Sequence, residues 1–236
     1  MLVLVLLAFL FTPSLATFGP TVTANWAGQF PYVVNFQNPS STVERTVTGL
    51  VLSSKMALVY QFLTPATINL FTMTDYALGV HSVVKLVGTA AGIYNVVKTC
   101  KAFGPARFNL TASEFYTFSA DTSDAAVIFF HNNALLSKST TALSDANCDA
   151  ALSAGISANQ ACVATDSTPG ICTTYIKDAA TYEWTAALVV QGRVQGFLSR
   201  GNCNMAGDNI LPTQFDKIVV RRQDILGISG IVVDNP

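Results

Sequence analysis

Short segments rich in valine, isoleucine, phenylalanine, tyrosine and threonine recur along the whole 236-residue chain. Branched and aromatic side chains favour strands, and the glycine, proline, asparagine, aspartate and serine between these segments favour turns. Many short strands at this spacing predict an antiparallel sandwich or a pair of barrels. The predicted strands are 32–36, 46–52, 56–62, 68–73, 82–87, 93–97, 114–118, 125–130, 186–190, 193–198 and 217–220.

Helical periodicity is weak everywhere except in two segments, 146–154 and 221–228. The chain also has no internal repeat of the kind that marks solenoids and propellers. The pattern therefore predicts an all-β fold with helix confined to short segments.

The N-terminus carries an unbroken apolar run, Leu2 to Phe11, which is too short to span a bilayer as a helix. Such a run is typical of a secretory signal peptide, and Ser14 and Ala16 supply the small residues of a cleavage site. We expect residues 1–16 to be removed and the secreted, extracellular chain to be 17–236. The alternative interpretation of the run is a buried first strand.

Charge is scarce in this chain, which has 11% charged residues and a formal net charge of −1. A protein that binds nucleic acid or an anionic membrane surface needs a basic patch, so neither partner is expected. The five cysteines and two histidines do not fall at zinc-finger spacing, and no nucleotide-binding loop is present. The sequence therefore predicts no metal and no cofactor.

Five cysteines in a secreted chain predict disulfides, with one thiol left over, but counting does not fix the pairing. Asn109 begins the one glycosylation sequon, because Pro39 spoils the sequon at Asn38. We expect Asn109 to lie in an exposed loop.

Several segments resemble the chymotrypsin-like serine proteases, and they occur in that family's order. Residues 143–162 resemble a disulfide-closed loop of the family's second barrel, and residues 189–203 resemble its hairpin and substrate-flanking strand. Residues 212–225 resemble its last strand and C-terminal helix. In the first barrel, residues 31–37 and 49–58 are similar to two early strands.

The resemblance implies two six-stranded antiparallel β-barrels followed by a short C-terminal helix. The first barrel is expected over about 28–120 and the second over about 121–236. At the family's first-barrel disulfide this chain has Val47 and Leu63, which suggests that packing has replaced the bridge. The resemblance also implies Cys148–Cys162 and Cys172–Cys203 disulfides, which leaves Cys100 as the free thiol.

Peptide hydrolysis in this family needs a serine nucleophile, an imidazole base, a carboxylate and backbone amides that hold the oxyanion. At the matching positions the base is replaced by Phe62 and the nucleophile by Trp184. The third position stays open between Asp124 and the weaker candidate Asp75. Because Phe62 cannot accept a proton, the sequence predicts that the chain is not an enzyme.

Rescue of the missing chemistry by a nearby residue is not expected. The histidines His81 and His131 do not lie in a matching context, and no serine lies between Cys172 and Ser199. Thr185 is a formal alternative nucleophile without a base.

The resemblance therefore implies a secreted, non-catalytic relative that binds a protein partner through the former substrate face, as a regulator or decoy. The identity of that partner does not follow from the sequence. The alternative is a structural or assembly component of a secretion, in which Cys100 forms intermolecular bonds. Residual serine-type hydrolysis is the least favoured interpretation.

Overall fold

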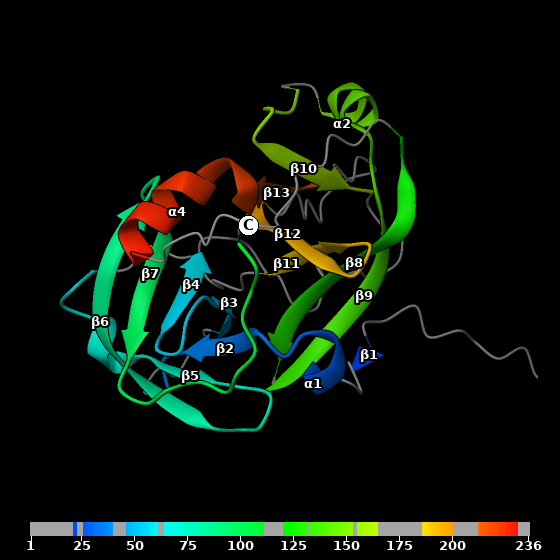
Figure 1. Ribbon diagram of the computed structural model, residues 1–236. Helices are drawn as coiled ribbons and strands as arrows, with labels where there is room; N and C mark the ends of the chain where they lie inside the picture. The colour runs from blue at the N-terminus through cyan, green and yellow to red at the C-terminus, as the bar shows by residue number, and fades with distance from the viewer. Residues whose placement is uncertain are drawn as a thin grey trace, which may run out of the picture.

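The computed structural model describes residues 21–22, 26–39, 46–60, 64–110, 120–131, 133–152, 155–164, 186–200 and 212–230. Two antiparallel barrels lie beside one another, with strands β2–β7 on the left of Figure 1 and strands β8–β13 on the right. Each barrel closes on itself through antiparallel strand pairing. The predicted all-β fold with two six-stranded barrels and a short C-terminal helix is confirmed.

The first barrel closes in the order β2-β3-β4-β7-β6-β5, with antiparallel neighbours throughout. Its longest strand, β6, has two register shifts, after Val83 and after Leu86, which bend it around the barrel. The strands are β2 (Val33–Gln37), β3 (Thr46–Val51), β4 (Met56–Tyr60), β5 (Thr72–Thr74), β6 (Val80–Ala90) and β7 (Tyr94–Thr99).

The second barrel closes through the pairing of its first two strands, and the short strand β1 (Thr21–Val22) adds to its outside by pairing with β9. The six strands of the ring are β8 (Thr122–His131), β9 (Ala134–Ala142), β10 (Gln160–Val163), β11 (Ala187–Val190), β12 (Arg193–Arg200) and β13 (Thr213–Lys217). The expected division of the chain at residues 120 and 121 stays a prediction.

Helical segments are short and lie at the ends of strands. Both predicted helices are present, as α2 (Asp145–Ala151), capped by the Ser144 side chain, and α4 (Arg222–Ser229). The helix α4 follows the last strand of the second barrel and packs back against β6 and β7 of the first barrel (Figure 1). No helix in the described part of the chain is long and apolar enough to cross a membrane. The other helical segments of the described residues are α1 (Trp26–Gln29), η1 (Ile68–Leu70) and η2 (Ile218–Arg221).

Apolar side chains form three clusters that explain this arrangement. One fills the first barrel around Phe36 and Met73, and another fills the second barrel around Phe129 and Phe215. The third draws residues from both barrels and α4, with Phe197 among its fully buried members. Burial of apolar area in the third cluster therefore holds the two barrels against one another.

Two predicted strands are wrong in part. The segment 68–73 begins as the 3₁₀ helix η1, in which Ile68 is buried and Leu70 is exposed, and it becomes a strand only at Thr72. Of the segment 217–220 only Lys217 is in a strand, because β13 ends there and the chain turns through η2 into α4. Its branched residues favour a strand, but the burial of Ile218 in the shared core fixes the turn instead. Strands β9 and β10 were not predicted, and the predicted strand 114–118 lies outside the described residues.

Candidate functional site

Two tyrosines of the first barrel reach one aspartate of the second barrel. The Tyr60 hydroxyl, at the end of β4, donates a short hydrogen bond to the Asp216 carboxylate on β13. The Tyr94 hydroxyl, at the start of β7, donates to the Asp216 backbone oxygen at 2.9 Å. The Gln160 side chain donates to the other carboxylate oxygen at 3.1 Å. The region where the barrels meet therefore contains a polar network inside the shared apolar core.

Aromatic packing encloses this network. The Tyr60 and Tyr94 rings meet edge to face with centroids 4.8 Å apart, and the Tyr60 ring stacks on Phe197 at 5.7 Å. Burial, and then the Asp216 carboxylate, raise the pKa of Tyr60 above its ordinary value, and the same two causes raise the pKa of Tyr94. Both phenols therefore stay neutral hydrogen-bond donors. Because both tyrosine side chains are buried, the network links the two barrels from within their shared core.

The predicted positions of the base and the nucleophile lie outside the described residues. Phe62 falls in 61–63, two residues beyond Tyr60, and Trp184 and Thr185 fall in 165–185. Cys172 and Cys203, and with them the second predicted disulfide, also lie outside the described residues. These assignments stay predictions.

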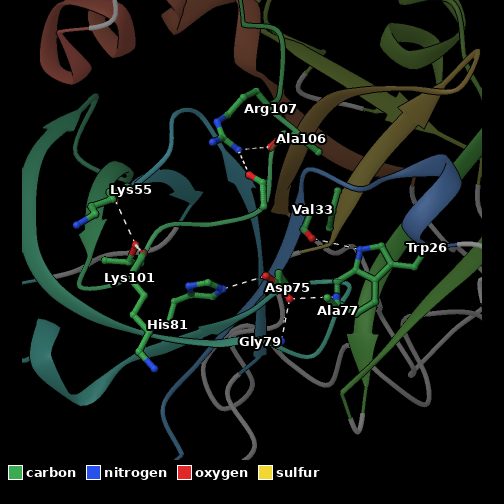
Figure 2. A network of polar contacts seen from close by, with 12 residues as sticks. Trp26, Val33, Lys55, Asp75, Ala77, Gly79, His81, Lys101, Ala106 and Arg107 are labelled. Atoms are coloured by element: carbon green, nitrogen blue, oxygen red, sulfur yellow. Dashed lines mark hydrogen bonds and ion pairs between the residues drawn. The ribbon is translucent and has the colours of Figure 1, made fainter.

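An imidazole and a carboxylate pair in the turn between β5 and β6. The Asp75 carboxylate accepts hydrogen bonds from the backbone amides of Ala77 at 3.0 Å and Gly79 at 2.8 Å. Its second oxygen lies 2.9 Å from Nε2 of His81, and Figure 2 shows the two side chains facing one another. His81 is buried against the Phe103 ring, with centroids 4.5 Å apart.

Among the described residues, this pair has no third member of a hydrolytic triad beside it. In the described part of the chain no serine or threonine hydroxyl hydrogen-bonds to His81, and its Nδ1 is buried without a partner. The pair instead holds the turn that exposes Leu78, whose backbone is left-handed at φ 60°. The function of Asp75 that the geometry shows is therefore to fix a turn.

Asp124, the other candidate for the third triad position, lies on β8 of the second barrel. Its side chain is exposed, and its backbone oxygen accepts a hydrogen bond from the Gln191 amide at 2.9 Å. Asp75 and Asp124 are thus on different barrels. The structure brings neither of them to another predicted catalytic residue in the part of the chain that it describes, and neither role is tested.

The remaining predicted residues are placed as follows. The Cys148–Cys162 disulfide is present, which confirms that pairing. Cys100 is exposed with a free thiol, and Asn109 is exposed as a glycan acceptor requires. Val47 is buried in the first-barrel core. Leu63, the other position of the replaced bridge, lies outside the described residues, so that replacement stays a prediction.

The large apolar side chains that are exposed in the described chain come from the end of η1, the turn between β5 and β6, and β6 itself. Leu70 is 50% exposed, Leu78 68%, Val80 56% and Val84 48%. Val80 and Val84 lie on one side of β6, because alternate residues of a strand share a face. The amide of Val83 bonds to the Phe71 carbonyl at 3.0 Å, which places Leu70 across from Val84.

Lysines border these apolar side chains. A β-bulge after Val83 leaves both Val84 and Lys85 exposed, and Lys85 pairs with Lys98 on β7. The Cys100 amide bonds to the Ser82 carbonyl at 3.0 Å, so the free thiol lies beside the middle of the apolar row. We call this surface the first-barrel face, and it consists of Leu70, Leu78, Val80, Ser82, Val84, Lys85, Lys98, Cys100 and Lys101.

The first-barrel face carries no exposed carboxylate among the described residues of its barrel. Their one acidic side chain, Asp75, is buried against His81. The face is therefore both apolar and cationic. Sequence reasoning missed it because the exposure of alternate residues on β6 is decided by how the barrel closes.

Comparison with solved structures identifies the class of fold. The chain is similar to kallikrein-related peptidase 10 in complex with Zn²⁺, with a TM-score of 0.59 and 16% identity over 86% of this chain and 97% of that one. It is similar to the inactivated protease paralogue S-D1 of the scabies mite, with a TM-score of 0.60 and 14% identity over 85% and 92%. It is also similar to the VesB protease of Vibrio cholerae, with a TM-score of 0.60 and 11% identity over 89% and 66%.

These similarities show the chymotrypsin-like serine protease fold. No protein-family model and no curated protein sequence matches the chain. The prediction that the chain is not an enzyme is wrong, because the solved structures that share its fold include proteases and peptidases. That prediction relied on Phe62 and Trp184, and the structure describes neither residue.

Proposed function

We propose that the protein is secreted and binds a protein partner through the first-barrel face. One observation carries the proposal: the exposed large apolar side chains of the described chain lie together on this face, bordered by lysines. Scattered exposed apolar residues are normal on any protein, whereas a contiguous group with a polar rim marks an interaction site.

The energetics favour a partner that covers the apolar row. Fully burying an exposed valine or leucine side chain is worth about 1.5–3 kcal/mol, so a side chain that is about half exposed, as those of this row are, gains about half of that. Leu70, Val80 and Val84 together therefore supply enough apolar area to anchor a bound segment, since a few residues carry most of the energy of an interface.

The lysines define the chemistry of that partner. Lys85, Lys98 and Lys101 favour an acidic surface, and electrostatic complementarity speeds association and excludes basic competitors. The partner is therefore a polypeptide that presents acidic and apolar side chains together. A nucleic acid or a sulfated polysaccharide satisfies the lysines but leaves the valines exposed to water.

Secretion is supported by the Cys148–Cys162 disulfide, which persists in oxidising compartments, and by the predicted signal peptide. The exposure of Asn109 supports a glycan there. Binding at the first-barrel face uses no catalytic group. The proposed binding is therefore independent of whether the protein hydrolyses peptides.

A defined peptide tests this proposal. In an extended chain that repeats Glu-Ser-Leu-Ser, the glutamates and leucines share one face, with the same spacing as Val80, Ser82 and Val84. We expect saturable binding of this peptide that weakens with salt. Peptides that repeat Lys-Ser-Leu-Ser or Glu-Ser-Ser-Ser should not bind, because each lacks one of the two features.

Two variants locate the binding. Val84→Glu adds a negative charge within the face, whereas Ala150→Glu adds the same charge at an exposed position of α2 on the second barrel. We expect Val84→Glu to abolish binding and Ala150→Glu to leave it unchanged, with thermal unfolding confirming that both variants fold. Equal binding by Val84→Glu, or tighter binding of heparin than of the acidic peptide, would overturn the proposal.

A further inference from the structure

A cavity of about 450 Å³ opens on the second barrel, between the end of α1, the strands β8, β9 and β11, and the turn at Gly192. This volume lies within the range of about 300–1,000 Å³ that is usual for ligand sites. The pairing of Ala126 with Ser139 and with Val189 places these three residues side by side on one surface of the barrel. Small residues at Ala126 and Gly192 leave the space that the cavity occupies.

The lining of the cavity combines polar walls with an apolar base. Ser123, Ser137 and Ser139 contribute hydroxyl groups, which both accept and donate hydrogen bonds. Phe30 and Val189 are buried and contribute apolar surface. The cavity is therefore suited to a ligand that has a polar end and a hydrocarbon part.

Asp124 gives the cavity its charge. The Asp124 carboxylate accepts no hydrogen bond and forms no ion pair within the described residues, where its contacts are made by the backbone. Among the described residues that line the cavity, none is basic. An anionic ligand is therefore disfavoured, and a cation gains an unshared carboxylate partner.

The chemistry of the lining separates an organic cation from a metal ion. The described residues contain no cluster of three or more metal-ligating side chains, and hard cations need several oxygen ligands. A primary ammonium has three hydrogen-bond donors, which match one carboxylate and neighbouring hydroxyl groups. Its aliphatic chain lies favourably on apolar surface such as Phe30 and Val189.

From this arrangement we infer that the cavity binds a primary ammonium group on an aliphatic chain, with Asp124 as its counter-ion. The ammonium comes from a lysine side chain of a bound polypeptide or from a free alkylamine. This site is on the opposite barrel from the first-barrel face and uses none of its residues. A negative result for the cavity would therefore leave the proposed binding at the first-barrel face untouched, and the reverse is also true.

Matched ligands test the role of the charge. N-acetyl-lysine amide and n-butylamine carry the ammonium, and N-acetyl-norleucine amide and n-butanol replace it with a neutral group of similar size. We expect saturable binding of the lysine derivative, of butylamine or of both, with shifts of the backbone NMR signals of 123–126, 137 and 139. Binding of the lysine derivative alone identifies a polypeptide as the source, and equal binding of butylamine identifies a small amine.

Substitutions test the role of Asp124 as the counter-ion of the ammonium group. Asp124→Asn keeps the shape of the side chain but removes its charge, and we expect it to weaken amine binding by about tenfold or more, as loss of a charged hydrogen bond does. Asp224→Asn makes the same change on exposed α4, and Val84→Glu changes the first-barrel face, so both should bind the amines normally. Equal binding of the neutral ligands, unchanged affinity in Asp124→Asn, or signal shifts confined to other residues would each overturn the inference.

Discussion

The hydroxyl group of Tyr60 in the first barrel donates a hydrogen bond to the carboxylate of Asp216 in the second barrel, 156 residues farther along the chain. The bond lies inside the apolar cluster that both barrels share, where Tyr60 stacks on Phe197. Hydrogen bonds to a charged acceptor are stronger than those between neutral groups. This contact therefore fixes how the two barrels meet.

Removal of the Tyr60 hydroxyl should destabilise the protein measurably. We expect Tyr60→Phe to lower the free energy of unfolding by about 1.5–3 kcal/mol, as loss of a charged hydrogen bond does. Tyr76→Phe is the matched control, because the Tyr76 hydroxyl has no hydrogen-bond partner among the described residues, and it should change stability by less than about 0.5 kcal/mol. Denaturant unfolding measures the stability of both variants. Equal stability of Tyr60→Phe and Tyr76→Phe would contradict a stabilising contact between Tyr60 and Asp216.

The same tyrosines should make the protein sensitive to alkaline pH. Burial raises the pKa of Tyr60 and Tyr94 above the ordinary value of 10.0, so above that pH the unfolded chain releases protons that the folded chain retains. Their contribution to stability is fully present below pH 10.0 and is lost as the pH rises further. We expect the melting temperature to fall steeply there and less steeply in the Tyr60→Phe, Tyr94→Phe double variant. Identical pH profiles would contradict this.

Acid should act through Asp121, which accepts hydrogen bonds from the Ser144 amide at 2.7 Å and from the Asn147 side chain at 2.9 Å. The backbone bond from Ser144, followed by the Asn147 bond, lowers the pKa of Asp121 below its ordinary value of 3.8. Its contribution to stability is present above pH 3.8 and is lost as the pH falls through the lower, folded-state pKa. We expect the melting temperature of Asp121→Asn to fall less on acidification than that of the wild type. The same fall in melting temperature with pH in both proteins would contradict this prediction.

Gly196 on β12 allows close approach of the neighbouring strand β13. A Cβ atom at this position would strike the carbonyl oxygen of Asp216 and lie 3.0 Å from its carbonyl carbon, and backbone in a barrel cannot move aside. We expect Gly196→Ala to cost about 1–3 kcal/mol. Gly227 on α4 has open space around it, so Gly227→Ala should stabilise by up to about 1 kcal/mol. Urea unfolding measures the free energy of unfolding of both variants. A change of the same sign in Gly196→Ala and Gly227→Ala would contradict the prediction.

Strands buried on both faces could be predicted from the sequence because they contain continuous apolar runs, as in β4 and β11. Strand β9 could not, since its Ser137 to Thr140 segment has the composition of a loop, even though Lys138 is buried. The strand predicted over 217–220 was wrong at 218–220, where the composition favours a strand and the structure has none. Its branched residues are typical of strands, but the burial of Ile218 places them in a 3₁₀ helix.

The candidate sites were harder to predict than the fold. The Cys148–Cys162 disulfide followed from the resemblance, and it closes a local loop. The contact between Tyr60 and Asp216 depends on the packing of two separate barrels, and no local pattern encodes it. The exposure of Val80 and Val84 likewise depends on which side of β6 faces out once the barrel has closed.

The reactivity of Cys100 gives the most direct test of partner binding at the first-barrel face. Its exposed thiol lies beside Ser82, so a bound segment should shield it from alkylation. We predict that saturating Glu-Ser-Leu-Ser peptide slows the alkylation of Cys100 by iodoacetamide about tenfold in the wild type and not at all in Val84→Glu. An alkylation rate that stays the same in the wild type when the peptide is bound would contradict binding at this face.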